Sequence, residues 1–278
     1  MAGILYVVAT PIGNLEDVTL RALRILREVS LIAAEDTRRT AKLLQHYSIS
    51  TRTTSLHEHN EHEKTPRLVH RLLAGESIAL VSDAGTPAIS DPGQALVAAA
   101  RDAGVRVESI PGPSAVMAAI SASGLQATEF LFLGFPPNRL NDLNKWLSDA
   151  VTEARLVVFF EAPHRIRRTL EALAALTGPE RVIAIARELT KAHEELVIKP
   201  ISMVLSELSS GRGEFTVLLP AVQIPATTAA APIDVGRMRV ELGQITEHGE
   251  VKRRDALKTL SHRHGIPVNE LYRLLQKP

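Results

Sequence analysis

Residues 81–93 combine the residue types that a small-molecule site needs. They read Val-Ser-Asp-Ala-Gly-Thr-Pro-Ala-Ile-Ser-Asp-Pro-Gly, follow the apolar run 78–81 and precede a helical pattern that opens at Pro92. Open α/β sheets bind ligands where a strand ends in such a loop. Small residues let a ligand approach the backbone, while Asp83 and Asp91 offer acceptors to hydroxyl, amino or cationic groups. This stretch therefore predicts a small-molecule site.

The loops after the first two apolar runs also carry polar side chains. Residues 10–17 connect a strand to a helix as phosphate-binding loops do, but they lack the glycine spacing of nucleotide-binding motifs. An ordinary β-α turn explains them equally well. Residues 35–38, Glu-Asp-Thr-Arg, end the second run. Asp36 suits the N-cap of the next helix, whereas Arg38 suits a phosphate or a carboxylate partner.

A later strand end, at residues 161–165, leads into a basic helix start. Its sequence is Glu-Ala-Pro-His-Arg, and Arg167 and Arg168 follow. Cations at a helix N-terminus oppose the helix dipole, which hints at an anion held nearby, although surface arginines without a role cost little there. Arg187 and Lys191 follow the next apolar run. A buried lysine can act as a base.

Residues 57–63, His-Glu-His-Asn-Glu-His-Glu, are dense in possible proton acceptors. Such groups can serve general acid–base catalysis, and their spacing could also mimic a metal site. A solvated, charged helix start would account for His62 and Glu63 without any function. For His59, Asn60 and Glu61, both interpretations stay open at this point.

Strand and helix patterns alternate along the first 110 residues. Apolar runs predict strands at 4–9, 31–34, 51–56, 78–81 and 105–110, with helices between them. This alternation predicts an α/β fold with a parallel, doubly wound sheet. A second α/β unit follows, with strands predicted at 130–135, 156–160, 182–186 and 215–219 and helices near Trp146 and over 165–176.

Composition divides the chain further. Pro-Gly-Pro-Ser at 111–114 marks a junction, so we expect α/β domains at 1–112 and 113–222. Residues 224–232 are low in complexity and indicate a flexible linker over 223–234. Residues 235–278 predict a small basic helical domain. Its short helices, at 253–264 and 268–276, have the spacing of a helix-turn-helix or of any small helical hairpin.

The composition excludes several classes of protein. The chain has 278 residues, 45% of them hydrophobic, and no cysteine, which excludes disulfides, thiolate metal sites and cysteine nucleophiles. No segment is apolar enough to cross a membrane and the first residues show no signal pattern, so we expect a cytoplasmic protein without a membrane partner. The net charge of +1 divides into +4 over residues 235–278 (nine Lys and Arg, five Asp and Glu) and −3 elsewhere. Such a tail suggests a polyanionic partner.

Seven stretches, in order, resemble the tetrapyrrole methylase superfamily and, within it, the branch that methylates ribosomal RNA. They are residues 8–15, 35–40, 57–61, 80–93, 111–115, 160–165 and 187–191. The tail is similar to the small C-terminal domain of that branch. Methylases acting on tetrapyrroles typically carry a glycine-rich first loop. Here the first loop has Gly13 alone beside Pro11, as in the RNA-modifying branch.

The resemblance implies two α/β domains with a cofactor cleft between them, plus the small C-terminal helical domain, usually in a homodimer. It implies S-adenosylmethionine as the cofactor and 2′-O-methylation of a cytidine ribose in 16S rRNA of the small (30S) ribosomal subunit. Methyl transfer of this kind requires no metal. Carried onto this chain, the cofactor-binding residues are Pro11, Gly13, Asn14, Asp83, Ala84, Gly85, Thr86, Ile89, Ser114, Ala115, Glu161 and Thr190.

A ribose hydroxyl is a weak acid, so the reaction needs a base or a group that stabilises the emerging alkoxide. The candidates, in order, are Glu61, His59, Lys191 and Glu161. The candidate RNA-binding residues are Arg38, Arg165, Arg168, Arg187, Lys252, Arg253 and Arg254.

Two other functions stay open at this point. One is a methylase of the precorrin type, against which the first loop and the tail both count. The other is a non-catalytic RNA-binding assembly factor. An aromatic content of 4% argues against an extended base-stacking platform in such a factor.

Overall fold

The computed structural model describes residues 2–208 and 213–221, together with eight single residues between 238 and 275. The chain divides into two compact units, Met1–Val222 and Gln223–Pro278. The predicted boundary between residues 112 and 113 is internal to the first unit. The predicted linker at 223–234 lies outside the described residues, as do Lys252, Arg253 and Arg254.

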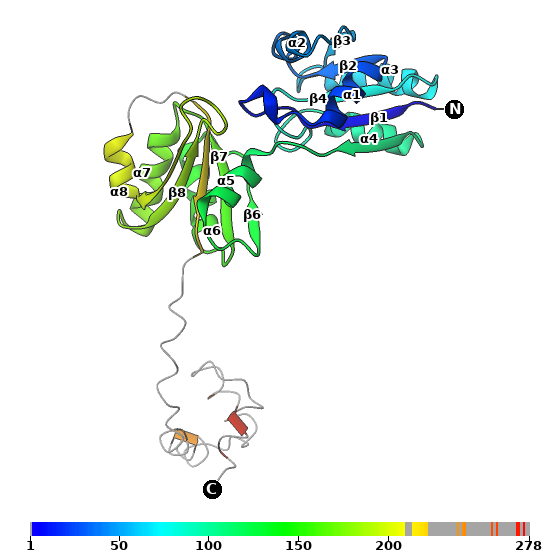
Figure 1. Ribbon diagram of the computed structural model, residues 1–278. Coiled ribbons are helices and arrows are strands. Elements are labelled where there is room, and N and C mark those ends of the chain that lie inside the picture. Colours follow the sequence, from blue (N-terminus) through cyan, green and yellow to red (C-terminus); the bar gives the residue numbers. More distant parts are fainter. Residues whose placement is uncertain are drawn as a thin grey trace. The chain divides into compact units, whose positions relative to one another are not determined.

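The first half of the larger unit is a five-stranded parallel sheet, which confirms the doubly wound prediction. The strands lie in the order β3-β2-β4-β1-β5, and every neighbouring pair is parallel (Figure 1). Their bounds are β1 Ile4–Val8, β2 Leu31–Ala34, β3 Thr53–Ser55, β4 Ile78–Val81 and β5 Arg106–Ile110. The helices are η1 Leu15–Asp17, α1 Leu20–Glu28, α2 Thr37–His46, α3 Glu61–Leu73 and α4 Gln94–Asp102.

Alternating side chains explain why helices cover both faces of this sheet. In β2, Leu31 and Ala33 pack with α3 and α4, while Ile32 and Ala34 pack with α1 and α2. Successive strand residues point to opposite faces, and both faces of β2 are apolar, so the whole strand is buried. Because β2 and β4 are parallel neighbours, the polar loops that follow them leave the sheet at the same edge.

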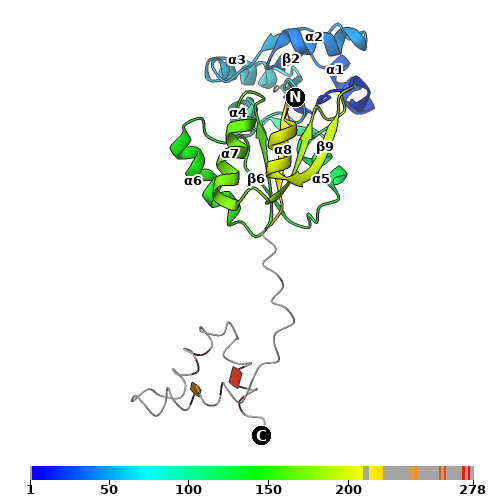
Figure 2. The same ribbon diagram turned by 90° about the vertical axis from the view of Figure 1, so that its left-hand side faces the viewer.

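The second half of the unit is a mixed sheet in the order β6-β7-β10-β8-β9. β6 is parallel to β7, whereas β10 runs antiparallel to both β7 and β8, and β9 antiparallel to β8. The bounds are β6 Phe130–Phe132, β7 Leu156–Glu161, β8 Val182–Arg187, β9 Glu195–Pro200 and β10 Phe215–Leu219. α6 Leu140–Val151, α7 Ile166–Thr177 and α8 Ile201–Glu207 cover one face, and α5 Ala115–Ser123 covers the other (Figure 2).

The sequence patterns missed α5, β9 and α8. The residues of α5 are all small or apolar, so no helical period distinguishes its buried face. β9 is an edge strand whose residues are at most partly buried, which weakens the alternation that marks a strand. The helix expected to open at Pro92 begins at Gln94. Gly93 occupies the N-cap with φ of +118°, and a Cβ there would lie 2.5 Å from a methyl of Leu80.

Six apolar side chains of the second unit form a buried cluster: Met238, Leu242, Leu257, Leu260, Leu271 and Leu275. A small apolar core therefore belongs to this unit. The predicted helices at 253–264 and 268–276 lie mostly outside the described residues, and the small helical domain stays a prediction. In the part of the chain that the structure describes, no helix is both long enough and apolar enough to span a bilayer.

Candidate functional site

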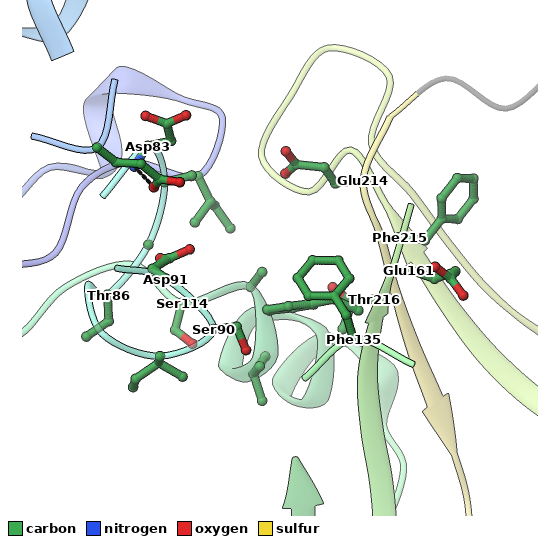
Figure 3. Close-up of a pocket in the computed structure, with 18 of the residues that line it drawn as sticks. Asp83, Thr86, Ser90, Asp91, Ser114, Phe135, Glu161, Glu214, Phe215 and Thr216 are labelled. Atoms are coloured by element: carbon green, nitrogen blue, oxygen red, sulfur yellow. Dashed lines mark hydrogen bonds between the residues drawn. The ribbon is translucent and has the colours of Figure 1, made fainter. Parts of the chain in front are cut away.

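A cavity of about 270 Å³ takes its walls from both halves of the larger unit (Figure 3). The first half contributes the loops after β1, β2 and β4. The second half contributes the start of α5, the residues after β6, the end of β7 and the start of β10. The lining residues are Ile12, Glu35, Arg39, Asp83, Ala84, Gly85, Thr86, Ile89, Ser90, Asp91, Ser114, Ala115, Val116, Phe135, Phe160, Glu161, Glu214, Phe215 and Thr216.

The loop after β4 forms one wall, and its backbone is fixed by direct contacts with the loop after β1. Thr10 and Gly85 exchange two backbone hydrogen bonds, each of 2.9 Å. Ala88 and Ser90, which are not glycines, have φ of 66° and 61°. Left-handed backbone at such residues costs free energy and collects at functional sites. The sequence-predicted stretch 81–93 therefore forms a strained, preorganised wall of the cavity.

Hydrogen bonds position the carboxylates of this wall. The backbone N–H of Asp83 donates to Glu35 Oε2 at 3.1 Å, and the N–H of Asp36 donates to Asp83 Oδ1 at 3.0 Å. Arg39 Nη1 lies 3.3 Å from Asp83 Oδ2. Burial, as the largest effect, raises the pKa of Glu35 above its usual value. The strand ends of β2 and β4 are thus joined through reciprocal acid-to-backbone bonds.

The cavity is acidic. The lining residues that the structure describes include one guanidinium, that of Arg39, and five carboxylates, those of Glu35, Asp83, Asp91, Glu161 and Glu214. Burial raises the pKa of Asp91 to about 6, and repulsion from Glu35, Asp83 and Glu214 adds to this effect. Such a cavity favours a ligand that carries positive charge.

Glu161 lies at the end of β7 and is 1% exposed. Thr169 donates a hydrogen bond of 2.5 Å to its Oε2, and the N–H of Ala162 donates one of 2.8 Å to its Oε1. Arg165 Nε lies 3.2 Å from the same Oε1, as an ion pair. Both carboxylate oxygens therefore have protein partners, which makes Glu161 a poor proton acceptor for a ligand.

Eight of the twelve predicted cofactor-binding residues line the cavity: Asp83, Ala84, Gly85, Thr86, Ile89, Ser114, Ala115 and Glu161. The other four described residues of that set, Pro11, Gly13, Asn14 and Thr190, lie outside the lining. The N–H of Asn14 donates to Thr190 Oγ1 at 2.9 Å, and a Cβ on Gly13 would lie 2.7 Å from that oxygen. Gly13, Asn14 and Thr190 therefore join the two halves of the unit by close packing.

The predicted catalytic residues other than Glu161 do not line the cavity. Glu61 is 9% exposed, and its Oε1 accepts hydrogen bonds from the N–H groups of Gly93, Ala95 and Leu96. His59 is exposed, before α3. Lys191 lines a smaller neighbouring cavity of about 30 Å³, where its Nζ lies 2.9 Å from Glu188 Oε1. Oε1 of Glu61 therefore caps α4, and the role of Glu61 as a base stays a prediction.

The predicted RNA-binding arginines differ in exposure. The side chain of Arg38 is 89% exposed and pairs with Asp36. Asp36 also caps α2, and the hydrogen bonds from Arg38 lower its pKa to about 2. Arg165 donates to the carbonyls of Pro136 and Pro137 at 2.5 and 3.0 Å, and Arg168 donates to that of Asn138 at 2.9 Å. Arg165 and Arg168 therefore bind backbone carbonyls of residues 136–138, and their predicted contact with RNA stays a prediction.

Arg187 is likewise engaged inside the protein. Its guanidinium carbon lies 5.5 Å from the centre of the Phe215 ring, and its Nη1 lies 4.0 Å from Glu195 Oε2. Its side chain is 22% exposed. This arginine, at the end of β8, therefore contacts one residue of β10 and one of β9.

Sequence reasoning missed several lining residues. Glu214, Phe215 and Thr216 arrive through the pairing of β10 with β7 and β8, which no local pattern announces. Phe135 and Phe160 end predicted strands, and although Phe160 also begins the stretch 160–165, neither is predicted to line a site. Glu35 is the neighbour of Asp36, which is a predicted N-cap. Its position directly after a buried strand could have indicated that it lines a site.

The comparisons with known proteins decide the family. Residues 4–204 match the family described as tetrapyrrole (corrin/porphyrin) methylases. This chain belongs to the tetrapyrrole methylase family. The methylase is 43% identical to a protein of Synechocystis over 98% of this chain and 97% of that protein. It is 46% identical to a protein of Pseudomonas aeruginosa, over 81% of each chain. Both relatives are named ribosomal RNA small subunit methyltransferase I.

Solved structures share the fold of this methylase. Diphthine synthase aligns with a TM-score of 0.62 and 17% identity, over 79% of this chain and 90% of that one. Uroporphyrin-III-C-methyltransferase from Thermus thermophilus aligns with a TM-score of 0.55 and 21% identity, over 78% and 94%. At these identities the likeness concerns the fold alone.

Proposed function

We propose that this protein is an S-adenosylmethionine-dependent methyltransferase that 2′-O-methylates a cytidine ribose in 16S rRNA of the small ribosomal subunit. The RNA substrate is proposed from the similarity to relatives named ribosomal RNA small subunit methyltransferase I. One of them is 43% identical over 98% of this chain. We extend the proposal to a cytoplasmic homodimer that acts without a metal. The cofactor cleft and the basic helical domain are part of the same proposal.

The charge of the cavity supports this cofactor. S-adenosylmethionine carries a sulfonium, an ammonium and a carboxylate, so its positive charge is in excess. The lining offers the carboxylates of Asp83 and Glu214 to cationic groups and the hydroxyls of Ser90 and Ser114 to polar ones. When bound, the cofactor supplies an electrophilic methyl group on sulfur.

Asp91 is the carboxylate that we propose as the proton acceptor for the ribose hydroxyl. It lines the cavity, and with a pKa of about 6 it is ionised at neutral pH while staying close to the value that favours general-base catalysis. Glu61 and Glu161 have oxygens that are occupied by backbone or Thr169 donors. We therefore place Asp91 ahead of Glu61, His59, Lys191 and Glu161, of which only Glu161 lines the cavity.

The test is transfer of tritium from methyl-labelled S-adenosylmethionine to 30S subunits that lack the modification, followed by nucleoside analysis. We expect labelled 2′-O-methylcytidine, and Asp91→Asn is expected to lower kcat by roughly 100-fold or more. Glu63→Gln, which removes an exposed charge on α3, is the matched control and is expected to act like the wild type.

Two results would replace this proposal. Labelling of uroporphyrinogen or a precorrin, with none on RNA, would assign the protein to small-molecule methylation. A protein that binds subunits but not S-adenosylmethionine would be a non-catalytic assembly factor.

A further inference from the structure

Two exposed apolar side chains line the acidic cavity. Phe135, which follows β6, is 52% exposed, and Ile89, in the loop after β4, is 54% exposed. Both line the cavity, one from each half of the unit. Large apolar side chains exposed together at the wall of a site mark contact with an apolar part of a ligand.

The two loops that carry these side chains lie against each other. Gly134 has φ of 65°, and a Cβ built on it would lie 3.2 Å from the hydroxyl of Ser90. Figure 3 shows the ring of Phe135 on the same side of the cavity as Ser90. Ile89 sits between Ala88 and Ser90, the two left-handed residues of its loop. Ser90, the neighbour of Ile89, therefore lies against the segment that carries Phe135.

The Phe135 ring is held in place from behind. It lies at 54° to the ring of Phe160 with centroids 5.4 Å apart, and the N–H of Phe160 donates to the carbonyl of Gly134 at 2.8 Å. The following residues, 136–138, have their carbonyls bound by Arg165, the N-cap of α7, and by Arg168 in its first turn. An aromatic side chain that is rigid and half exposed loses little conformational entropy when a flat ligand stacks on it.

Charge indicates which part of a nucleotide this surface accepts. The carboxylates of the cavity repel phosphate, so the neutral base and ribose have to approach them while the phosphates stay outside. Exposed cations stand nearby on the first half of the unit: Arg39 lines the cavity with 61% of its side chain exposed, and its neighbour Arg38 is 89% exposed. Proteins that bind single-stranded nucleic acid commonly stack its bases on aromatic side chains.

We propose that Phe135 and Ile89 form the stacking site for the base of the acceptor nucleotide, and this inference rests on the function proposed above. Phe135 supplies the π face and Ile89 an apolar contact, which moves Ile89 from the cofactor-binding set that the resemblance implied to the side of the acceptor nucleotide. Arg165 and Arg168, which the sequence suggested as RNA ligands, act as positioning residues for the loop that presents Phe135.

The experiment compares Phe135→Ala, Phe135→Leu and Phe135→Trp with the wild type. It measures kcat and KM for 30S subunits at saturating S-adenosylmethionine, and the Kd of S-adenosylmethionine by calorimetry, which also reports that each variant is folded. Because stacking on an aromatic ring stabilises a bound base, Phe135→Ala and Phe135→Leu are expected to lower kcat/KM by about 5- to 100-fold. Phe135→Trp should restore it. The Kd of the cofactor should stay within about twofold.

Leu176→Ala is the matched control, since Leu176 is 45% exposed at the end of α7 and does not line the cavity. Its kinetics should equal those of the wild type. The inference is overturned if Phe135→Leu is as active as the wild type, or if the Kd of the cofactor rises as much as kcat/KM falls, because Phe135 would then bind the cofactor. Failure of the wild type itself to methylate subunits overturns the proposed function and this inference together.

Discussion

The Oε1 oxygen of Glu61 accepts a hydrogen bond of 2.8 Å from the backbone N–H of Ala95. The same oxygen accepts from the N–H groups of Gly93, at 3.0 Å, and Leu96, at 3.3 Å. The first N–H groups of a helix lack intrahelical partners, and Gly93 at the N-cap of α4 has no side chain to accept from them. A carboxylate from α3 therefore caps α4 and anchors the C-terminal end of the cavity loop.

Glu61→Ala should lower the free energy of unfolding by about 1–3 kcal/mol, because it leaves buried N–H groups without an acceptor. Glu61→Gln keeps an acceptor oxygen and should cost less. Urea denaturation monitored by circular dichroism measures both. Glu63→Ala, an exposed change two residues along α3, should stay within about 0.5 kcal/mol of the wild type. Equal stability of Glu61→Ala and Glu63→Ala would disprove the capping role.

Asp91→Asn should raise the melting temperature at pH 8. The pKa of Asp91 is about 6 in the folded protein against 3.8 in the unfolded chain, so the folded state binds the proton more tightly. The ionised carboxyl is therefore destabilising above pH 6, and this penalty disappears as the pH falls below 4. Thermal unfolding from pH 4 to 8 should show a difference between variant and wild type that grows with pH. A constant difference would contradict this account.

Thr190→Val should weaken the contact between the two halves of the larger unit. Valine has the shape of threonine but no hydroxyl, so the N–H of Asn14 loses its acceptor at 2.9 Å. The expected cost is roughly 0.5–1 kcal/mol in unfolding free energy, together with a weaker affinity for S-adenosylmethionine. Thr190→Ser keeps the oxygen and serves as the control. If the two variants bind the cofactor equally well, the contact has no bearing on the cavity.

Salt dependence should separate Arg38 from Arg165. An exposed arginine that binds RNA phosphate releases a counterion, so Arg38→Ala should reduce the slope of log KM for subunits against log salt by about 0.7–0.9. Arg165→Lys should leave that slope unchanged and lower the melting temperature, because one ammonium cannot reproduce its bonds to Pro136 and Pro137. A slope altered by Arg165→Lys alone would reverse these assignments.

The strands were predictable where a run of apolar residues is buried on both faces. Residues 31–34, 78–81 and 215–219 form strands with the bounds that the sequence predicted. The loop 81–93 was predictable for a related reason, because glycine, proline and acids directly after such a run leave few roles other than ligand binding. These features are local in the chain, so local patterns report them.

The rest of the site depends on contacts between distant segments. Glu61 stands in a sequence cluster that looks catalytic, yet its partners are N–H groups of residues 93–96, which no pattern around residue 61 reveals. Lys191 likewise has the residue type of a base, but Glu188 lies at 2.9 Å and holds its ammonium. Glu214, by contrast, belongs to no sequence motif and precedes residues 215–219, whose pattern predicts only a strand. Its role emerges only when β10 pairs with β7 and β8.

The distance in sequence between the walls of the cavity has a consequence for synthesis of the protein. Ile12 comes from the loop after the first strand, and Thr216 belongs to β10, the last strand of the larger unit. A growing chain can form the parallel sheet early, since β1 to β5 end at Ile110. It can enclose the cavity only after β10 has left the ribosome and inserted between β7 and β8. The cavity is thus complete only in chains translated through β10, and a truncated product lacking that strand would carry the first sheet without an enclosed cavity.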